Sequence, residues 1–564
     1  MPRVAVESVA EGYLVLLKAR GIDWLFANAG TDFAPLIEAF ARGTKAGLAM
    51  PEPVTVPHET VAVGMAHGYY LATGRPQAVM VHVNVGMANA LMGLLNAVRD
   101  DIPIFFTAGR TPITEAGRLG SRDLPIHWGQ EMFDQAAMLR EYVKWDYELR
   151  GGDQLSTVID RALAIAMAPP RGPVCLSLPR EVLAAQLDGF TYSETPRQQP
   201  PAPPQPAADA IADAAERIAG ARRPLIIAGR GSVGGEASDV LARFAERFAI
   251  PVVHFWPSRL ALPTTHPMHA GFDAGPWLED ADLILVLDAM VPWIPSRQVL
   301  VEGCTVIQIG PDPLFSKLPV RGFPADLAIA AEPAAMISAL HEALAQKPDD
   351  ALIEARRVWA QARIAKARDA VRERIAAART TPMGAAWISH CLDQVKGDAM
   401  LFNELGCDPA TMTFARPDGW FSHSLAGGLG WGLPAALGAQ LADRERLVIA
   451  AIGDGSYIFA NPVACHQVAA ALELPVLTIV FDNARWDAVR KSTAAVYPDG
   501  HAVQSNRMAL VSLDPSPAYE QIVRACGGHG ERVENPEELP TALERALHVV
   551  RVERRQALLD VVCA

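Results

Sequence analysis

The stretch RLVIAAIGDGSYIF, residues 446–459, decides how this chain is interpreted. Its apolar run ends abruptly in Gly453-Asp454-Gly455, which is typical of a buried strand that stops at a turn. The helical pattern NPVACHQVAAALEL follows, and the apolar run PVLTIVF then ends at Asp482-Asn483. Strand, helix and strand in this order indicate a parallel sheet, whose strand ends meet at the edge where ligands bind.

A cation and a phosphate group suit this edge. The carboxylate of Asp454 and the carboxamide of Asn483 would converge there. Two such oxygens and a nearby backbone carbonyl suit Mg²⁺, which completes its coordination with phosphate oxygens and water. The glycines let the backbone approach a phosphate, and the N–H groups at the following helix start favour negative charge. The sequence therefore predicts one half of a Mg²⁺–diphosphate site, with a plain turn as the alternative.

The arrangement resembles the signature of thiamine diphosphate (ThDP) enzymes, in which Gly-Asp-Gly is followed at similar spacing by an Asn pair. Residues 456–482 separate the two parts here, and Asp482-Asn483 stands in place of Asn-Asn. The resemblance implies that Asp454, Asn483 and the carbonyl of Arg485 hold Mg²⁺. The positions that it implies for the diphosphate end of the cofactor are Gly453, Gly455, Ser456 and Tyr457, together with Gly406 and Cys407 in NELGCD.

Length and composition are those of a large globular protein. The 564 residues are 50% apolar and 20% charged, enough for about three or four domains of ~150 residues. The net charge of −13 argues against nucleic acid as a partner, because phosphate binding needs a basic face. Seven dispersed cysteines without a CxxC pair are typical of reduced thiols. With no signal-peptide pattern and no long apolar run, we expect a cytoplasmic protein without a membrane partner.

Two breaks divide the chain. A proline-rich segment predicts a semi-rigid linker, and a charged, Ala- and Arg-rich stretch before Pro382 predicts a connecting helix. The predicted parts are a first domain at 1–190, a linker at 191–207, a central domain at 208–345, a connecting helix at 346–380 and a third domain at 381–564. Each domain alternates apolar strands with helical stretches, so the predicted fold class is α/β, with three mostly parallel sheets flanked by helices. Segments 77–109 and 446–483 share one local plan, which indicates duplicated domains; the alternative is that any two parallel α/β units look alike.

Over nearly the whole chain the sequence resembles the pyruvate oxidase, acetolactate synthase and benzoylformate decarboxylase group of ThDP enzymes. The resemblance implies a pyrimidine-binding first domain, a Rossmann-like central domain and a diphosphate-binding third domain. In PVTVPHETVAVGMAHGYYLATGRP, Glu59 matches the glutamate that hydrogen-bonds N1′ of the aminopyrimidine and promotes loss of the C2 proton of the thiazolium. The alternative for Glu59 is a favourable partner of the helix dipole. In GGLGWGLPAALG (427–438), Gly427 matches the carbonyl that accepts from the 4′-amino group, and Leu429 matches the side chain that supports the bent cofactor.

Further matches lie closer to the benzoylformate decarboxylase branch. In VMVHVNVGMANALMGLLNAV, His82 matches a catalytic histidine, and in FANAGTDF, Thr31 matches a substrate-binding serine. A histidine near the cofactor would relay protons, since histidine titrates near neutrality; a hydrogen-bonded strand histidine is the alternative. The stretch DAMVPWIPSRQ lacks the second histidine of that branch. Gln130, in HWGQEMF, matches an active-site glutamine of the acetolactate synthases, which are the second choice.

The segment after Asn483, ARWDAVRKSTAAVYPDG, differs from both reference groups. We expect ThDP- and Mg²⁺-dependent decarboxylation of a 2-oxo acid, with carboligation to 2-hydroxyketones as a further outcome. Acetolactate synthase-like carboligation of pyruvate is the alternative. The residues expected to line the substrate pocket are Thr31, His82, Gln130, Trp486, Ala488, Val489 and Ser492.

The central domain carries a second glycine motif. PLIIAGRGSVGG places Gly229, Gly231 and Gly234 in GxGxxG spacing after a strand, which suggests a dinucleotide site. The next strand, IPVVHFW, ends without the acidic residue that grips a ribose, so FAD is not expected. A flavin-linked oxidoreductase is the alternative from another enzyme class.

A third hypothesis is a non-catalytic regulatory subunit with the ThDP fold. The presence of Glu59, Asp454 and Asn483 argues against it. In the family, the sites form between the first domain of one subunit and the third domain of another. The resemblance therefore implies a homodimer or homotetramer.

Overall fold

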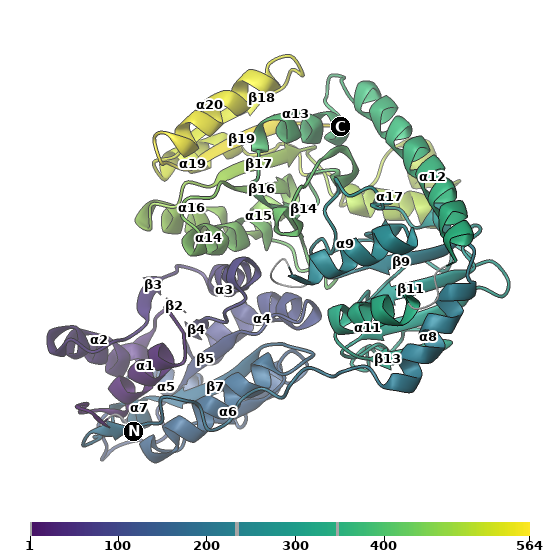
Figure 1. Cartoon of the computed structure of the whole chain (residues 1–564). Coiled ribbons are helices and arrows are strands. Elements are labelled where there is room, and N and C mark those ends of the chain that lie inside the picture. The colour runs from purple at the N-terminus through teal and green to yellow at the C-terminus, as the bar shows by residue number, and fades with distance from the viewer. Residues whose placement is uncertain (1–2, 232–235, 346–348) are drawn as a thin grey trace. The chain divides into compact units, whose positions relative to one another are not determined.

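The computed structural model describes residues 3–231, 236–345 and 349–564, which fold as two compact units. One unit comprises Met1–Ala202, Ser424–Arg444 and Ala460–Leu474. The other comprises Pro203–His423, Glu445–Phe459 and Pro475–Ala564. Figure 1 labels many of the helices and strands.

The first unit is built on a six-stranded parallel sheet in the order β3-β2-β4-β5-β7-β6. Its strands are β2 (Trp24–Ala27), β3 (Glu52–Thr55), β4 (Ala78–Val81), β5 (Phe105–Arg110), β6 (Asp146–Glu148) and β7 (Val174–Pro179). A small antiparallel pair, β1 (Arg3–Val4) and β8 (Phe190–Thr191), joins the ends of this region. The helices are α1 (Val9–Ala19), α2 (Ala34–Ala46), α3 (Glu59–Thr73), α4 (Val83–Arg99), α5 (Ile126–Gly129), α6 (Leu155–Met167), α7 (Arg180–Ala184), α14 (Gly432–Ala442) and α16 (Pro462–Ala471), with 3-10 turns η1 (Thr31–Phe33), η2 (Ala136–Leu139) and η3 (Gly152–Gln154).

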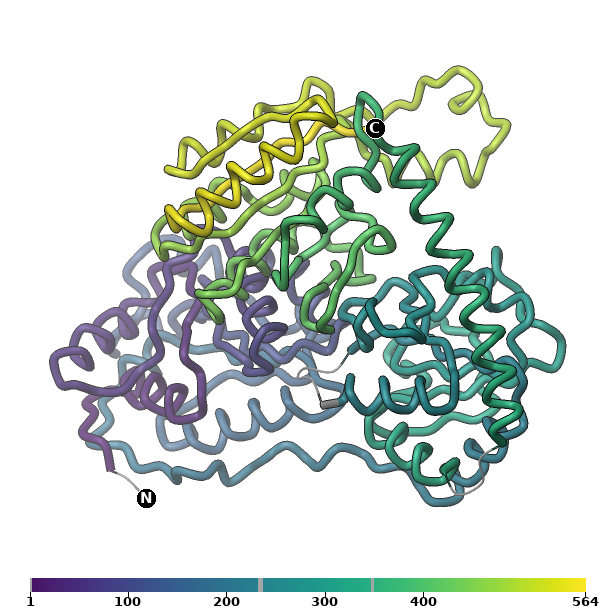
Figure 2. Tube along the Cα trace, turned by 45° about the horizontal axis from the view of Figure 1, so that its top comes forward, coloured from purple at the N-terminus to yellow at the C-terminus, as the bar shows by residue number. Residues whose placement is uncertain are grey.

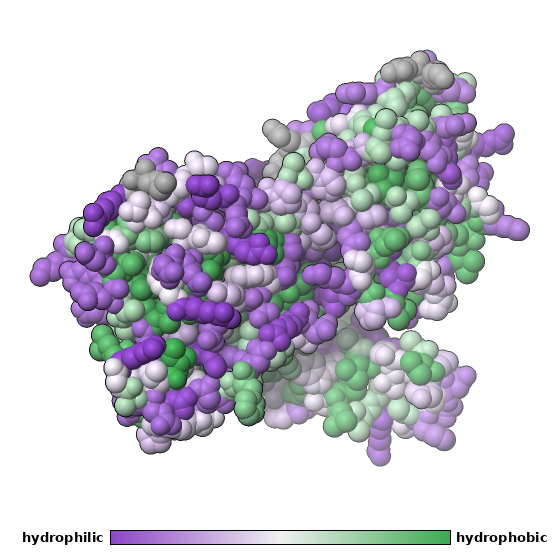
Figure 3. Space-filling model, turned by 90° about the horizontal axis from the view of Figure 1, so that it is seen from below, coloured by the Kyte–Doolittle hydropathy of each residue, from purple (hydrophilic) through white to green (hydrophobic). Residues whose placement is uncertain are grey.

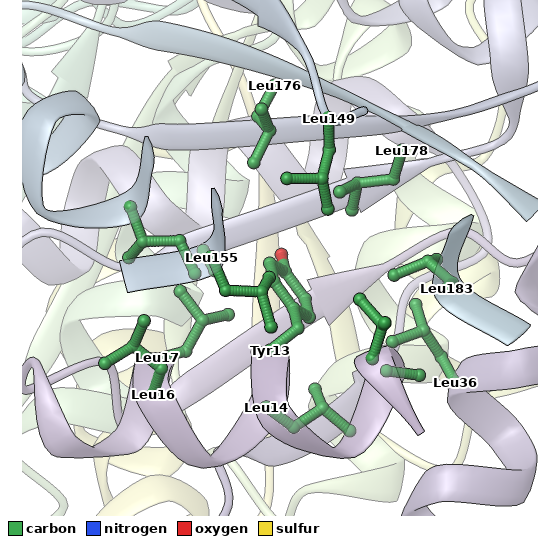
Figure 4. Close-up of a cluster of buried hydrophobic side chains, with 14 of the residues drawn as sticks. Tyr13, Leu14, Leu16, Leu17, Leu36, Leu149, Leu155, Leu176, Leu178 and Leu183 are labelled. Carbon is green, nitrogen blue, oxygen red and sulfur yellow. The ribbon is translucent and has the colours of Figure 1, made fainter. Parts of the chain in front are cut away.

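A leucine-rich core lies beneath α1. Every residue of α1 from Val9 to Leu17 is buried, because one side of the helix meets the sheet and another meets α2, α6 and α7. Figure 4 shows Tyr13, Leu155 and Leu178 among the side chains that meet there. Each fully buried leucine contributes roughly 1.5–3 kcal/mol, so this core anchors the sheet that carries the site.

Two glycines allow α3 and α14 to cross at close range within the first unit. A Cβ atom on Gly68 of α3 would lie 1.8 Å from the carbonyl oxygen of Ala435. A Cβ atom on Gly438 of α14 would lie 1.9 Å from the carbonyl oxygen of Met65. The contact leaves no space for a larger residue, and it holds the helix that begins at Glu59.

The second unit contains two parallel sheets. The five-stranded sheet has the order β10-β9-β11-β12-β13, with β9 (Pro224–Ala228), β10 (Val252–Val253), β11 (Leu283–Leu287), β12 (Thr305–Gly310) and β13 (Leu327–Ala330). The six-stranded sheet has the order β15-β14-β16-β17-β19-β18, with β14 (Met400–Glu404), β15 (Trp420–Ser422), β16 (Val448–Gly453), β17 (Leu477–Asp482), β18 (His529–Val533) and β19 (Ala557–Val562). The helices are α8 (Ala208–Gly220), α9 (Glu236–Phe248), α10 (Gly275–Leu278), α11 (Pro333–Ala345), α12 (Asp350–Ala377), α13 (Ala385–Lys396), α15 (Asp454–Phe459), α17 (Asp487–Val496), α18 (His501–Ser505), α19 (Tyr519–Ala525) and α20 (Leu539–Arg551), with η4 (Pro409–Thr411) and η5 (Pro417–Gly419).

The two six-stranded sheets have the same topology. Numbered in chain order within each sheet, the strands run 2-1-3-4-6-5 in both. The shared local plan seen in the sequence is therefore a shared architecture, and the predicted fold class is confirmed. In this order the first and third strands are neighbours, and the chain leaves them in opposite directions. Ligands bind at such switch points, which lie after β2 and β4 in one sheet and after β14 and β16 in the other.

Helix α12 is the long helix expected between the central and third domains, and Figure 2 shows it as one continuous rod. Its Arg356 is buried and donates to the carbonyl oxygens of Ile218 and Ala221 at the end of α8, at 2.6 Å each. The guanidinium also reaches the carbonyl of Phe248 at the end of α9. Carbonyl groups at a helix end lack partners within the helix, so one arginine caps two helices and docks α12 onto α8 and α9.

The glycines of the GxGxxG motif are used in packing. A Cβ atom on Gly229 would lie 2.6 Å from the Cα atom of Ala289, and one on Gly231 would lie 2.0 Å from the carbonyl oxygen of Leu260. Gly234 lies outside the described residues. The first two glycines are thus required by the close approach of the chain to itself.

Across the described ranges, no helix combines the length and apolar character needed to span a bilayer. On the face drawn in Figure 3, hydrophobic residues form small patches among hydrophilic ones.

Candidate active site

Glu59 is the first residue of α3, four positions after β3 ends at Thr55. Its side chain is buried, and its Oε2 atom accepts a hydrogen bond from Nδ2 of Asn89 at 3.2 Å. The backbone carbonyl of Asn89 accepts from the hydroxyl of Thr60 at 2.9 Å. Asn89, on α4, therefore holds both the carboxylate and the start of α3. Sequence reasoning missed this residue, which lies 30 positions from Glu59.

The loop before α14 is held by a second asparagine of α4. Asn96 accepts from the N–H of Gly428 at 3.1 Å and donates to its carbonyl at 2.8 Å. The neighbouring Gly427 has φ +72°, a left-handed conformation that suits glycine, and Leu429 is half-buried. The predicted positions Gly427 and Leu429 thus lie on a loop whose backbone is fixed by α4.

A histidine and a carboxylate meet at the switch point of the first sheet. His82 follows β4, and its Nδ1 atom lies 2.5 Å from Oδ1 of Asp32, which follows Thr31 after β2. Its Nε2 atom lies 3.2 Å from Nε2 of Gln130. The hydrogen bond to Asp32 raises the pKa of His82, against the opposing effect of burial. The structure therefore brings the predicted residues Thr31, His82 and Gln130 to one edge and adds Asp32 to them.

Thr31 is oriented by a second histidine, His127. The buried Nδ1 atom of His127 accepts from the backbone N–H groups of Asp123 and Leu124, at 3.2 and 3.3 Å. Its Nε2 atom consequently carries the proton and donates to the hydroxyl of Thr31 at 3.4 Å. Burial and the charge of Arg180 lower the pKa of His127, so it is neutral near pH 7. The Thr31 hydroxyl keeps its own proton for another acceptor.

In the second unit, Asp454 stands at the switch point of the six-stranded sheet, directly after β16. Its side chain is 3% exposed; Oδ1 accepts from the N–H of Gly455 at 2.7 Å, and Oδ2 has no hydrogen-bond partner among the described residues. Burial raises the pKa of Asp454 to about 6, and the charge of Asp482 adds to the shift. A bound cation would satisfy the unpaired oxygen, so the residue fits a metal ligand.

Asn483 lies beside this carboxylate, because Gly453 of β16 pairs with Phe481 of β17. Its Oδ1 atom accepts the N–H of Arg485 at 3.1 Å and keeps a second lone pair. Within the described ranges, no three His, Cys, Asp or Glu residues cluster as metal ligands. A cation here would therefore depend on one carboxylate together with amide and carbonyl oxygens, which is the donor set expected for Mg²⁺.

The departure from an Asn pair at Asp482 has a structural reason. Its carboxylate accepts from the hydroxyl of Ser516 at 2.9 Å and from Nη1 of Arg532 at 3.1 Å. The same Arg532 donates to Asp560 of β19 at 2.6 Å. The Asp482 side chain therefore belongs to an internal ion-pair network.

The other positions matched to the diphosphate end are buried or close-packed. Gly406 follows β14, and a Cβ atom on it would lie 2.8 Å from the backbone of Ala451. Burial raises the pKa of Cys407 to about 12, so its thiol is neutral. Ser456 is buried, and the ring of Tyr457 packs edge-on against Tyr519 with centroids 5.4 Å apart. These side chains support the turn, and a role in binding remains a prediction.

Trp486 covers the Gly-Asp-Gly turn. A Cβ atom on Gly455 would lie 2.2 Å from Cζ3 of Trp486, and the indole also meets Phe459 edge-on with centroids 5.8 Å apart. Trp486 caps α17, in which no residue is buried. The predicted pocket residues Ala488, Val489 and Ser492 are exposed on this helix, and their role remains a prediction.

Comparison with known families identifies all three parts of the chain. Residues 7–138 match "Thiamine pyrophosphate enzyme, N-terminal TPP binding domain", residues 211–340 match the central domain and residues 405–561 match the C-terminal TPP binding domain. The chain belongs to the thiamine pyrophosphate enzyme family. It is accordingly a ThDP-dependent enzyme.

Individual relatives are distant but cover most of the chain. A benzoylformate decarboxylase of Pseudomonas aeruginosa is 27% identical, over 94% of this chain and 95% of the relative. The acetolactate synthase isozyme 3 large subunit of Escherichia coli is 26% identical, over 89% and 86%. A solved benzoylformate decarboxylase from Polynucleobacter necessarius has a TM-score of 0.77 and 22% identity, with 99% of each chain covered. At family level, the activity is that of a ThDP-dependent decarboxylase or an acetolactate synthase-like enzyme.

Proposed function

We propose that this enzyme decarboxylates a 2-oxo acid with ThDP and Mg²⁺, in the manner of a benzoylformate decarboxylase. The proposal rests on the position of His82, which lies between Asp32 and Gln130 at the switch point of the six-stranded sheet of the first unit. Helix α3, which begins at Glu59, follows β3 of the same sheet. The hydrogen bond to Asp32 raises the pKa of His82 and so favours its protonated form, which can supply a proton from Nε2.

The residues that the family resemblance assigns to the cofactor would divide its binding between the pyrimidine ring and the diphosphate. Bound ThDP supplies the electron sink for loss of carbon dioxide from a 2-oxo acid. Glu59 would hydrogen-bond the pyrimidine ring, and its burial excludes water from that contact. Asp454, Asn483 and the carbonyl of Arg485 would hold the Mg²⁺ ion of the diphosphate. The Oδ2 atom of Asp454, which has no hydrogen-bond partner in the part of the chain that the structure describes, supports this assignment.

Thr31 would position the substrate. Its hydroxyl accepts from His127 and keeps a proton to donate, which suits the carboxylate of a 2-oxo acid. His82 would then protonate the carbon from which carbon dioxide has left. Trp486, Ala488, Val489 and Ser492 would shape the space for the substrate side chain.

Acetolactate synthase-like carboligation of pyruvate is the second candidate. The observation that favours it is Gln130, whose amide lies beside His82. The flavin-linked alternative has less support, because close packing alone accounts for glycine at positions 229 and 231. An assembly of two or four copies, with sites completed between subunits, and a cytoplasmic location remain predictions from the sequence.

Product analysis tests the proposal. The protein would be incubated with ThDP and Mg²⁺, separately with benzoylformate and with pyruvate, and the mixtures followed by proton NMR. Aldehyde from benzoylformate supports the decarboxylase, whereas acetolactate from pyruvate supports the second candidate. Glu59→Gln should abolish turnover, and Glu52→Gln, an exposed position on the preceding strand, should leave it unchanged. Full turnover by Glu59→Gln would contradict the assignment of the site.

A further inference from the structure

We propose that Asp32 is a positioning residue that fixes the ring orientation and protonation of His82, so that the Nε2 atom of His82 exchanges the proton of the reaction. The proposal rests on the role given above to His82. It adds a residue that the family resemblance does not assign.

The contact between the two side chains defines the tautomer. The Asp32 side chain is buried, and its Oδ1 atom lies 2.5 Å from Nδ1 of His82. A carboxylate only accepts hydrogen bonds, so Nδ1 carries the proton and Nε2 is the atom that changes its protonation. The second oxygen, Oδ2, accepts from the backbone N–H of Val83 at 3.4 Å. One carboxylate thus holds the ring and the backbone that follows it.

Two glycines make room for this pair. A Cβ atom on Gly30 would lie 2.2 Å from the His82 ring, and a Cβ atom on Gly109 would lie 1.5 Å from Oδ2 of Asp32. Neither glycine has a positive φ, so backbone conformation does not require glycine at these positions. The clearance is specific to the pair, because any larger residue would displace the histidine or the carboxylate.

The backbone after His82 is strained. Val83 has φ +33°, in the left-handed region that a β-branched residue seldom adopts. Such a conformation costs about 1–3 kcal/mol and persists only where the surroundings hold it in place. Here the N–H of Val83 is bonded to Asp32. The strained residue sets the direction in which the chain leaves His82 and enters α4.

The surroundings of the Nε2 atom of His82 suit both the neutral and the protonated ring. Nε2 of His82 faces Nε2 of Gln130 at 3.2 Å, which suits a neutral imidazole that accepts there. Oε1 of Gln130 is buried and has no hydrogen-bond partner among the described residues. Rotation of the amide by half a turn would present Oε1 to a protonated Nε2. Gln130 can therefore hydrogen-bond to Nε2 of His82 whether or not that nitrogen is protonated.

The charges around His82 favour the protonated form. Asp32 acts through both its hydrogen bond and its charge, and Glu59 acts through its charge, whereas burial opposes them. His127 is a further titratable group near the ring, and burial and Arg180 keep it neutral. The pKa of His82 is therefore raised while that of His127 is lowered.

The titration of each histidine can be measured without a substrate. The method is hydrogen exchange at the imidazole C2 position, detected in single peptides by mass spectrometry. In the unaltered protein, His82 should titrate at higher pH than His127. Asp32→Asn, which keeps the side-chain shape, should lower the midpoint of His82 by at least about one pH unit, a tenfold loss of proton affinity. Asp123→Asn, which removes an exposed carboxylate 3.3 Å from His127, should leave the midpoint of His82 unchanged.

An unchanged midpoint of His82 in folded Asp32→Asn would overturn the proposal. If that variant does not fold, the unaltered protein decides, because a midpoint of His82 at or below that of His127 would also overturn it. Failure to turn over 2-oxo acids would reject the proposed function and leave the titration result standing. If the enzyme is active, the double variant Asp32→Asn/His82→Gln should have the same kcat as His82→Gln alone. A further loss of kcat in the double variant would contradict the proposal that Asp32 acts through His82.

Discussion

Gly68→Ala should destabilise the protein, although helix propensity alone predicts the opposite. Glycine inside a helix costs roughly 0.5–1 kcal/mol relative to alanine, and Gly68 lies within α3. The added Cβ atom would lie 1.8 Å from the carbonyl oxygen of Ala435, whereas ordinary van der Waals contact begins at 3.4 Å. The difference, 3.4 − 1.8 = 1.6 Å, is the least separation of α3 and α14 that would restore ordinary contact there. The atom that it meets is backbone, which cannot rotate away.

The size of the effect follows from two opposing contributions. Overpacking of a core costs typically about 1–3 kcal/mol, and a rigid backbone contact lies at the upper end of that range. Subtracting a gain of about 1 kcal/mol in helix propensity leaves a net loss of about 2 kcal/mol. For a folding unit of this size, the loss corresponds to a fall of about 4–8 °C in Tm.

Urea unfolding followed by tryptophan fluorescence is the assay. Trp431, the N-cap residue of α14, meets His67 of α3 edge-on, with ring centroids 5.4 Å apart, and is one of the 11 tryptophans whose emission follows unfolding. Gly220→Ala, at the end of α8, is the matched control, because outside its own helix and chain neighbours no heavy atom of the described residues lies within 4 Å of the added Cβ atom. The control should be neutral or slightly stabilising. If Gly68→Ala were as stable as the unaltered protein, the close crossing of α3 and α14 would be wrong.

Three further predictions concern the second unit. Arg356→Met should lower the free energy of unfolding by about 3 kcal/mol in urea, because it removes the charged donor to the buried carbonyl groups of Ile218 and Ala221. Arg372→Met, at an exposed position of the same helix, should change it little, and equal effects would contradict the capping role. Burial lowers the pKa of His269 to about 3, so between pH 7 and pH 5 the unfolded histidine, with its ordinary pKa near 6.5, takes up a proton that the folded one does not. The free energy of unfolding should therefore fall by about 2 kcal/mol between pH 7 and pH 5 because of this residue. In urea unfolding at the two pH values, His269→Leu should remove that part of the fall. An unchanged pH dependence in this variant would refute the prediction. Asp454→Ala should abolish Mg²⁺-dependent binding of ThDP in isothermal titration calorimetry, whereas undiminished binding would show that the cation is held elsewhere.

Much of the fold could be predicted from short segments, because strand ends and turn residues are local features. The run that ends at Gly453-Asp454-Gly455 and the next run, which ends at Asp482-Asn483, are strands β16 and β17, paired side by side. The shared plan of segments 77–109 and 446–483 became one strand order in two sheets. The local sequence also pointed to Thr31, His82 and Gln130, since each lies in a short segment that resembles a family motif.

The partners of these residues were decided by tertiary structure alone. Asp32 meets His82 because β2 and β4 are neighbours in the sheet, although the two residues are 50 positions apart. Arg532 of β18 reaches Asp482 across β19, a pairing that depends on the strand order. The sequence by itself determined which residues stand at strand ends and how the strands and helices alternate, because apolar periodicity and turn chemistry act over a few residues. Only the folded chain decided which side chains meet, because hydrogen bonds and close glycine contacts depend on the packing of distant segments.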